Sequence, residues 1–409
     1  MLSGRHKFRV VIQDGMTADS YVFGCWSAVT DWLATFVDLE ASARTYKAFR
    51  RARGVRSAGD LLRLAMIWSV CGLSLRNTCA WAAGCGVAEL SDASLNDRLS
   101  GTADWLGFLV GSVLKERIGA APSVAGRRLR VVDATTICRP GADRTTWRLH
   151  VSYDLAKGQV DALTLTDVHG GERLSRFAPR AGDLLLGDAG YPKPGDLRAL
   201  VRAGADVVVR LGWNSLKLNT PEGAPFDLFK VLRGFEGPRT ECAVIVDDHE
   251  PDPPALSARL VIGRKPEAEA EKARRKVRQQ ASKRGKTPDA RSLEAAGFIL
   301  LLTTLPADQS APPDILELYR FRWQVELLFK RWKSLLDLDA LPARGEPLAR
   351  CWLFAKILAI LMIEDWSNQI LEASPSGPAG DTIQALHLAP RRHRGPNDPT
   401  EHSRTPSKP

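Results

Sequence analysis

The sequence predicts an α/β protein in which helices precede a sheet-forming part. Residues 1 to about 120 carry apolar side chains at helical spacing, as in residues 60–70. From Arg128 onward, short apolar runs typical of strands alternate with helical segments. The alternation stops over residues 213–295, where short strand candidates lie among Pro- and Gly-rich turns, and it resumes at 297–304. We therefore expect an α/β domain interrupted by a strand-rich insertion that does not continue the central sheet.

Composition is that of an ordinary globular protein with a basic surface. Of the 409 residues, 44% are hydrophobic and 25% are charged, which excludes wholesale disorder. Lys and Arg number 57 against 47 for Asp and Glu, so the net charge is +10. That balance favours a polyanionic partner, nucleic acid before an anionic membrane. A basic protein without such a partner is the alternative.

Cysteine usage and apolar runs indicate a cytoplasmic protein. The seven cysteines are scattered with no C-x-x-C pair, which argues against a disulfide framework and a structural zinc site. The N-terminus lacks the apolar stretch of a signal peptide. The longest apolar run, residues 352–363, contains Lys356 and is too short to span a bilayer. We expect it to form a buried helix, and we expect no membrane partner.

The helical part contains two short helices that resemble a helix-turn-helix. We expect one helix over 75–83, a break at Gly84 and Gly86, and a second helix capped by Ser91 or Asp92 and ending at residue 99. Many all-α bundles contain such a turn. A basic stretch precedes the pair and is either a solvated helix face or a phosphate-binding surface. Its members are Arg44, Lys47, Arg50, Arg51, Arg53 and Arg56.

The α/β part begins with three strands and continues with a fourth strand that runs into Asp188. Within the insertion, a charge-dense stretch over 264–286 is either a solvated arm or a phosphate clamp. The returning strand leads into one long helix and then an apolar helix, and residues 372–409 are typical of a disordered tail. The expected strands are 129–133, 147–154, 162–167, 183–187, 206–211 and 297–304, and the expected helices are 194–203, 313–336 and 348–370.

Two aspartates, Asp133 and Asp188, follow apolar strand segments. Ligand sites of open α/β sheets gather outside the C-terminal ends of strands, and a bare acid there requires a cation or a donor. Glu326 on the long helix supplies a third carboxylate. Oxygen ligands of this kind favour Mg²⁺, and two such ions ~4 Å apart can activate a water for phosphodiester cleavage. We expect the three carboxylates to lie within ~8 Å of one another.

The long helix aligns Glu326 with three further polar side chains. Tyr319, Arg322, Glu326 and Lys333 lie at offsets of 0, 3, 7 and 14. At ~100° per residue these offsets fall within about a 60° arc. The pattern predicts either an exposed face with salt bridges or a face on which Arg322 and Lys333 hold a polyanionic substrate.

Together these residues resemble the DDE transposases of bacterial insertion sequences. Asp133 lies in VVDAT, Asp188 lies in GDAGY, and the helix carries Tyr-x2-Arg-x3-Glu-x6-Lys, the signature of the insertion-sequence-four family. The resemblance implies an RNase H-like catalytic domain interrupted by a mainly β insertion and preceded by a helical DNA-binding domain. The implied boundaries are 1–120 for the helical domain, 121–212 and 296–371 for the two catalytic parts, 213–295 for the insertion and 372–409 for the tail.

The resemblance also implies a cut-and-paste transposase. In such an enzyme Asp133, Asp188 and Glu326 bind two Mg²⁺ ions, for which Mn²⁺ can substitute. The enzyme cleaves double-stranded DNA at the terminal inverted repeats, passes through a hairpin and joins the ends to target DNA. It works as a homodimer on paired ends. No nucleotide cofactor is expected, since the chain lacks a G-x-x-x-x-G-K-[ST] loop. The expected DNA contacts are Tyr319, Arg322, Lys333, Lys330, Arg210 and Phe298.

Other interpretations fit the same residues. Phe298 would stack on an unpaired base or form part of the core. A metal-dependent nuclease on this fold would keep the acids but would neither transfer strands nor need paired ends. A DNA-binding regulator or inhibitor of transposition would keep the basic surface without the chemistry.

Overall fold

The computed structural model describes residues 26–116, 126–138, 146–247, 256–339, 341–342 and 345–373. The described residues up to Trp366 form one compact unit, and those beyond it belong to a second. Most of the expected tail, residues 374–409, lies outside the described residues. Within these ranges no helix combines the length and the apolarity that crossing a membrane requires.

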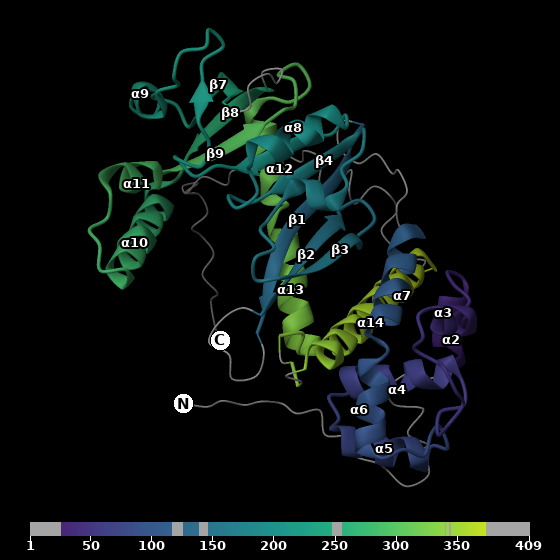
Figure 1. Ribbon diagram of the computed structural model, residues 1–409. Helices are drawn as coiled ribbons and strands as arrows, with labels where there is room; N and C mark the ends of the chain where they lie inside the picture. The colour runs from purple at the N-terminus through teal and green to yellow at the C-terminus, as the bar shows by residue number, and fades with distance from the viewer. Residues whose placement is uncertain are drawn as a thin grey trace, which may run out of the picture. The chain divides into compact units, whose positions relative to one another are not determined.

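The N-terminal part of the described chain is helical, as predicted (Figure 1). Ser57 and Ser91 cap two of its helices, because their hydroxyls accept hydrogen bonds from the backbone N–H groups of Asp60 and Ser94 at 3.0 and 3.2 Å. Gly86, at φ 66°, makes the turn between the two short helices. The helices are α2 (Trp26–Ala34), α3 (Leu39–Thr45), α4 (Ala58–Val70), α5 (Leu75–Gly84), α6 (Asp92–Ser100) and α7 (Ala103–Glu116).

The strands form one nine-stranded sheet in the order β3-β2-β1-β4-β5-β9-β8-β7-β6. The pairs β1–β4 and β4–β5 are parallel, and the other neighbours are antiparallel. The strands are β1 (Arg128–Ile137), β2 (Trp147–Asp154), β3 (Gln159–Asp167), β4 (Asp183–Gly187), β5 (Asp206–Arg210), β6 (Leu218–Asn219), β7 (Arg239–Val246), β8 (Leu256–Arg264) and β9 (Phe298–Thr303).

The insertion was expected to stay outside the central sheet, and this expectation is wrong. Strand β9 pairs with β5 on one side, where Val208 faces Thr303, and with β8 on the other, where Leu260 faces Leu302. Strands β7 and β6 follow beyond β8. The free donors and acceptors along the second edge of β9 are satisfied by this pairing, which a buried strand requires. The insertion is strand-rich, but its strands extend the sheet.

The single helix expected over 313–336 is two helices, α12 (Pro312–Arg320) and α13 (Trp323–Leu336). Between them the backbone hydrogen bonds tighten to i→i−3, since Phe321 and Arg322 donate to the carbonyls of Leu318 and Tyr319, both at 3.1 Å. In Figure 1, α13 lies across β1, and the two elements are in contact. The remaining elements are η1 (Leu174–Phe177), α8 (Pro194–Arg202), α9 (Leu228–Gly234), α10 (Glu267–Lys283), α11 (Ala290–Ala295) and α14 (Glu346–Ala373).

Alternating residues of the strands bury both faces of the sheet. In β1, Val131 belongs to the hydrophobic cluster that also contains the N-terminal helices and α14. The next residue, Val132, belongs to the cluster on the other face, which contains apolar residues of α8 and alternate apolar residues of β8 and β9. The apolar helix expected over 348–370 is confirmed as α14, which supplies buried residues to the first cluster.

Buried ion pairs tie the first four strands together. Arg130 of β1 contacts Asp161 of β3 and Asp183 of β4, both at 2.8 Å. Arg128 contacts Asp154 of β2 at 2.8 Å and also pairs with Asp161. Removing one partner of a buried ion pair is strongly destabilising because the other charge remains buried. Asp154 and Asp183 are therefore structural counter-ions.

Candidate active site at the edge of the parallel strands

Strand register explains why Asp133 and Asp188 come together. The parallel pairing of β1 with β4 ends with Val131 opposite Leu186. Asp133 follows Val131 by two residues, and Asp188 follows Leu186 by two residues. Two residues is the period that returns a side chain to the same face of a strand. We expected Asp133 at the end of its strand. Strand β1 continues to Ile137 in its pairing with β2, so Asp133 lies within the strand. Both acids nevertheless lie just beyond the C-terminal end of the parallel pairing between β1 and β4.

Asp133 lies in a partly buried and negatively charged environment. Its side chain is 18% exposed, and burial raises the pKa of its carboxyl to about 6. A hydrogen bond from the backbone N–H of Ala134 at 2.8 Å and the charge of Arg322 oppose that rise in pKa. The negative charges of Asp188 and Glu172 add to it. Ionisation of Asp133 is therefore disfavoured even with the positive charge of Arg322 nearby.

The side chains of the helix signature contact both aspartates. The hydroxyl of Tyr319 donates to Oδ1 of Asp188 at 3.3 Å. Nη1 of Arg322 lies 3.7 Å from Oδ2 of Asp133, and its Nη2 lies 2.5 Å from Oε1 of Glu326. Only 14% of the Arg322 side chain is exposed, against 45% for Glu326. One guanidinium thus links the strand acid to the helix acid, which excludes a plain solvated face for this array.

Three of the other expected DNA contacts lie on or near the same array. Lys333 is half-buried and Lys330 is exposed on α13. Arg210, the last residue of β5, is half-buried, and its charge acts on the Tyr319 phenol.

Phe298 lies away from this array. It is 9% exposed in the hydrophobic cluster that contains α8, on the face of the sheet opposite Val131. Its ring packs against Phe235 at a centroid distance of 5.9 Å, and the Arg264 guanidinium lies 5.0 Å from its centre. This environment fits the core interpretation of Phe298 and leaves no open ring face for a base.

The donor set suits a hard divalent cation, although the acids are not gathered around one point. In the described part of the chain, no three His, Cys, Asp or Glu side chains lie close enough to hold a metal ion. Arg322 occupies the position between Asp133 and Glu326 and supplies the positive charge there. The charge of Asp188 helps to raise the pKa of Asp133, and Mg²⁺ or Mn²⁺ would stabilise a carboxylate in that setting. Convergence of all three acids on one site stays a prediction.

Near the aspartates, Glu172 carried no sequence signal. Glu172 lies in the loop between β3 and η1, and its charge acts on both Asp133 and Tyr191. Tyr191 follows Asp188 in the GDAGY segment and is fully buried. A glutamate in a polar loop has no periodicity to mark it, so only the fold reveals its neighbours. Trp323, next to Arg322, is 50% exposed and offers an aromatic face to solvent.

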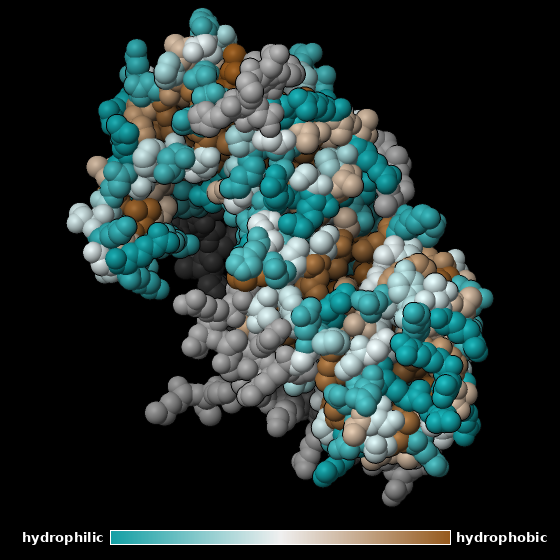
Figure 2. Space-filling view, in the orientation of Figure 1, coloured by the Kyte–Doolittle hydropathy of each residue, from teal (hydrophilic) through white to brown (hydrophobic). Residues whose placement is uncertain are grey.

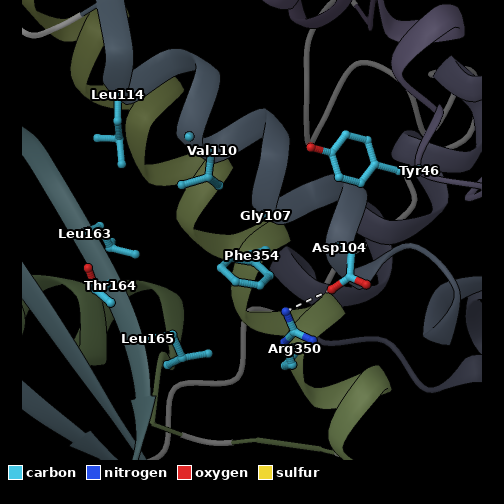
Figure 3. A pocket seen from close by; sticks show the side chains of 11 residues that line it. Tyr46, Asp104, Gly107, Val110, Leu114, Leu163, Thr164, Leu165, Arg350 and Phe354 are labelled. Carbon is cyan, nitrogen blue, oxygen red and sulfur yellow. Dashed lines mark ion pairs between the residues drawn. The ribbon is translucent and has the colours of Figure 1, made fainter. Parts of the chain in front are cut away.

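A cavity of about 490 Å³ lies away from these acids. Figure 3 shows it between α7, β3 and α14, with Leu163, Val110 and Phe354 on its walls. The Arg350–Asp104 ion pair, at 3.0 Å, lines it as well. Hydrophobic residues are exposed between β3 and α7 on the face of the molecule drawn in Figure 2. None of the signature residues lines this cavity, so it is distinct from the acidic site.

The basic stretch near the N-terminus is exposed and lies mostly in the loop between α3 and α4. All six of its Arg and Lys side chains face solvent, and none forms an ion pair with another described residue. The stretch over 264–286 is mainly the helix α10, in which Arg274 pairs with Glu267 at 2.6 Å and Arg278 with Glu271 at 2.8 Å. The first stretch is therefore free to bind phosphates, whereas the second is partly neutralised.

Comparison with known proteins gives consistent matches. The family described as Transposase DDE domain matches residues 125–362. A putative transposase of insertion sequence element IS186A from Escherichia coli strain K12 is 38% identical over 360 residues, which cover 87% of this chain and 97% of that protein. The transposase for insertion sequence element IS421 from Escherichia coli is 38% identical over 361 residues, with the same coverage of 87% and 97%.

More distant proteins match as well. A transposase for insertion sequence element IS231F from Bacillus thuringiensis subsp. israelensis is 25% identical over 365 residues, covering 79% of this chain and 76% of that protein. A cryo-EM structure of the piggyBac transposase synaptic complex with hairpin DNA aligns with a TM-score of 0.47 and 9% identity, covering 90% of this chain and 80% of that one. That structural overlap is too low to assign a shared fold.

Proposed function

The chain belongs to the transposase DDE domain family and is a DNA transposase of an insertion sequence, and from this premise we propose that it works by cut-and-paste transposition. It would cleave double-stranded DNA at the terminal inverted repeats of its element and transfer the freed ends to target DNA. A homodimer on two paired ends would carry out both steps.

The proposal includes an RNase H-like catalytic core. The strand order β3-β2-β1-β4-β5, with β2 antiparallel to β1 and β4 and β5 parallel to it, supports that assignment. Helix α13 brings Glu326 to the face of β1 on which Val131 and Asp133 lie. The proposed insertion, residues 213–295, would then extend this core from the β9 side.

Asp133, Asp188 and Glu326 would hold the divalent metal of the family, Mg²⁺ or in its place Mn²⁺. When bound, such ions activate a water or hydroxyl for attack on a phosphodiester and stabilise the leaving oxygen. The raised pKa of Asp133, at about 6, supports a site that is completed by a cation. Tyr319 fixes the rotamer of Asp188 through its hydrogen bond at 3.3 Å.

Arg322 and Lys333 would bind DNA phosphates beside the acids. Before substrate binds, the guanidinium of Arg322 holds Glu326 and compensates the charge of Asp133. A guanidinium can exchange a carboxylate for a phosphate because both accept its paired N–H donors. Lys330 and Arg210 would extend this phosphate-binding surface along α13 and the end of β5.

The N-terminal helices would bind the terminal repeats. The six exposed cations at the end of α3 and in the loop to α4 support this role, because phosphate contacts supply most of the affinity of a protein for DNA. Helices α5 and α6 are in contact and joined by a glycine turn, as the two helices of a DNA-reading pair would be.

The observation that carries the proposal is the contact of Tyr319 and Arg322 with the two strand aspartates. The test is incubation of the purified chain with a labelled duplex of its element's end and a target plasmid, in Mg²⁺. We expect nicks, hairpins and joined products. Asp188→Ala and Glu326→Ala should abolish them and leave end binding in a gel-shift assay intact. Asp308→Ala, at an exposed position away from the array, is the matched control.

The outcomes of that assay separate the three functions. Cleavage without joined products would identify a nuclease. Binding of the wild-type chain without any cleavage would identify a regulator. Wild-type cleavage rates in both alanine variants would remove the acids from the mechanism.

A further inference from the structure

Helix α10 of the insertion carries a row of lysines along one side. Residues 272–286 include eight Lys and Arg residues and neither Asp nor Glu. Lys276 and Lys283 follow Lys272 by 4 and 11 residues, so at ~100° per residue the three side chains lie within about a 40° arc. All three are exposed. They form a lysine face on the helix.

The other side of α10 holds arginines that are already neutralised. Arg274 and Arg278 follow Lys272 by 2 and 6 residues, which places them opposite the lysine face. Nη1 of Arg274 lies 2.6 Å from Oε1 of Glu267, and Nη1 of Arg278 lies 2.8 Å from Oε1 of Glu271. No residue of the lysine face has such a counter-ion among the described residues. The helix therefore keeps its uncompensated positive charge on one face.

Sheet topology brings α10 to the edge at which the acids lie. Strands β1, β4 and β5 are parallel, so their C-terminal ends share one edge of the sheet, just beyond which Asp133 and Asp188 lie. Strand β9 runs antiparallel to β5 and begins at that edge, and β8 ends there because Arg264 pairs with Phe298. Helices α10 and α11, which connect β8 to β9 and contact each other, leave the sheet at this edge (Figure 1).

A further lysine lies near both the acidic site and the lysine face. Lys265 follows β8 directly, and its Nζ donates to the carbonyl of Ala296 at 2.7 Å. Burial lowers the pKa of this lysine, and the charges of Arg210 and Lys276 lower it further, while Glu269 opposes them. Arg210 is one of the proposed phosphate contacts beside the acids. Positive residues therefore continue from the acidic site toward α10.

We propose that the lysine face of α10 binds the phosphate backbone of the DNA duplex that is cleaved at the acidic site. This inference rests on the proposed cleavage of double-stranded DNA. Lysines contact phosphates as point charges and displace condensed counterions, so the contact is independent of base sequence. The three lysines span about 16 Å along the helix axis, a length comparable to about five base pairs of duplex at about 3.4 Å each.

The test compares two double variants that remove equal charge from the same helix at the same i, i+4 spacing. Lys272→Gln with Lys276→Gln changes the lysine face, and Arg274→Gln with Arg278→Gln changes the neutralised arginines. Binding of the full-length protein to a duplex of the element's end is measured by fluorescence anisotropy across a range of salt concentrations. We expect the lysine variant to reduce the slope of log K against log salt by about 1.8. Since the difference vanishes near 1 M salt, binding at 0.1 M should weaken about 60-fold.

The arginine variant should bind as the wild type does, and the lysine variant should lose the same affinity for a duplex of unrelated sequence. Thermal melting checks that both variants fold. An unchanged slope in the lysine variant, or an equal decrease in both variants, overturns the inference. An unchanged slope with an altered oligomeric state would assign the lysine face to a protein contact and would also overturn it. Failure of the wild type to bind either duplex would instead overturn the proposed function.

Discussion

Replacing Asp133 by asparagine should stabilise the metal-free protein while abolishing DNA cleavage. Burial and the charges of Asp188 and Glu172 raise the pKa of this carboxyl, so its ionised form is held in the native state at a cost. Asparagine carries no charge, and its Oδ1 can still accept the 2.8 Å hydrogen bond from the N–H of Ala134. The substitution thus removes the unfavourable charge and keeps the local geometry.

The magnitude follows from the shift of the Asp133 pKa. The value rises from 3.8 to about 6, and at 1.36 kcal/mol per unit this amounts to about 3 kcal/mol. Because the native state binds the proton more tightly, wild-type stability falls as pH rises through the window from about 3.8 to 6. Asp133→Asn should therefore exceed the wild type in free energy of unfolding by about 3 kcal/mol at pH 8 and by about half of that at pH 5.

The assay is urea denaturation in EDTA at pH 8 and pH 5, followed by tryptophan fluorescence. Asp308→Asn, at an exposed position, should show no gain in stability at either pH. No stabilisation of Asp133→Asn at pH 8 would refute the reasoning, and so would a gain of the same size at pH 5. In excess Mn²⁺ the order should invert, because only the wild type keeps the full set of metal-binding carboxylates.

Three further predictions address the signature, the core and the basic stretch. Arg322→Lys should fold normally but cleave an end-bearing duplex about 10²–10³-fold more slowly, because an ammonium cannot contact two anions as a guanidinium does; unchanged rates would contradict this. Burial lowers the pKa of Lys356 to about 8, so the unfolding free energy of the wild type should rise between pH 8 and 10 relative to Lys356→Met, by at most about 3 kcal/mol. A difference in unfolding free energy between the wild type and Lys356→Met that stays constant from pH 8 to 10 would refute this prediction. Arg50→Ala and Arg51→Ala should each reduce the slope of log K against log salt for end binding by about 0.9, and an unchanged slope would exclude them from phosphate contact.

Patterns within the sequence identified the residues of the candidate site. Short apolar runs located the strands before Asp133 and Asp188, and the offsets in the signature put Tyr319, Arg322 and Glu326 on the same side of a helical segment. Serine caps and glycines located the helix boundaries of the N-terminal part. These features depend on backbone geometry over a few residues, so a sequence displays them directly.

Only the tertiary structure decided how those residues meet. The helix divides at Phe321–Arg322 without a Pro or Gly, at the point where the flanking side chains contact the two strand aspartates. The insertion strands join the sheet because β9 presents a second edge, which no local pattern indicates. Glu172 comes beside Gly190 only through the packing of two loops.

The physical reason is that apolar periodicity reports which face of an element is buried but not what covers it. The sequence by itself determined the strands outside the insertion, most of the helices and the acids of this transposase. Strand register and side-chain contacts between distant segments depend on the free energy of the whole fold. The juxtaposition of Asp133 with Asp188 and the guanidinium between Asp133 and Glu326 were therefore decided by the tertiary structure alone.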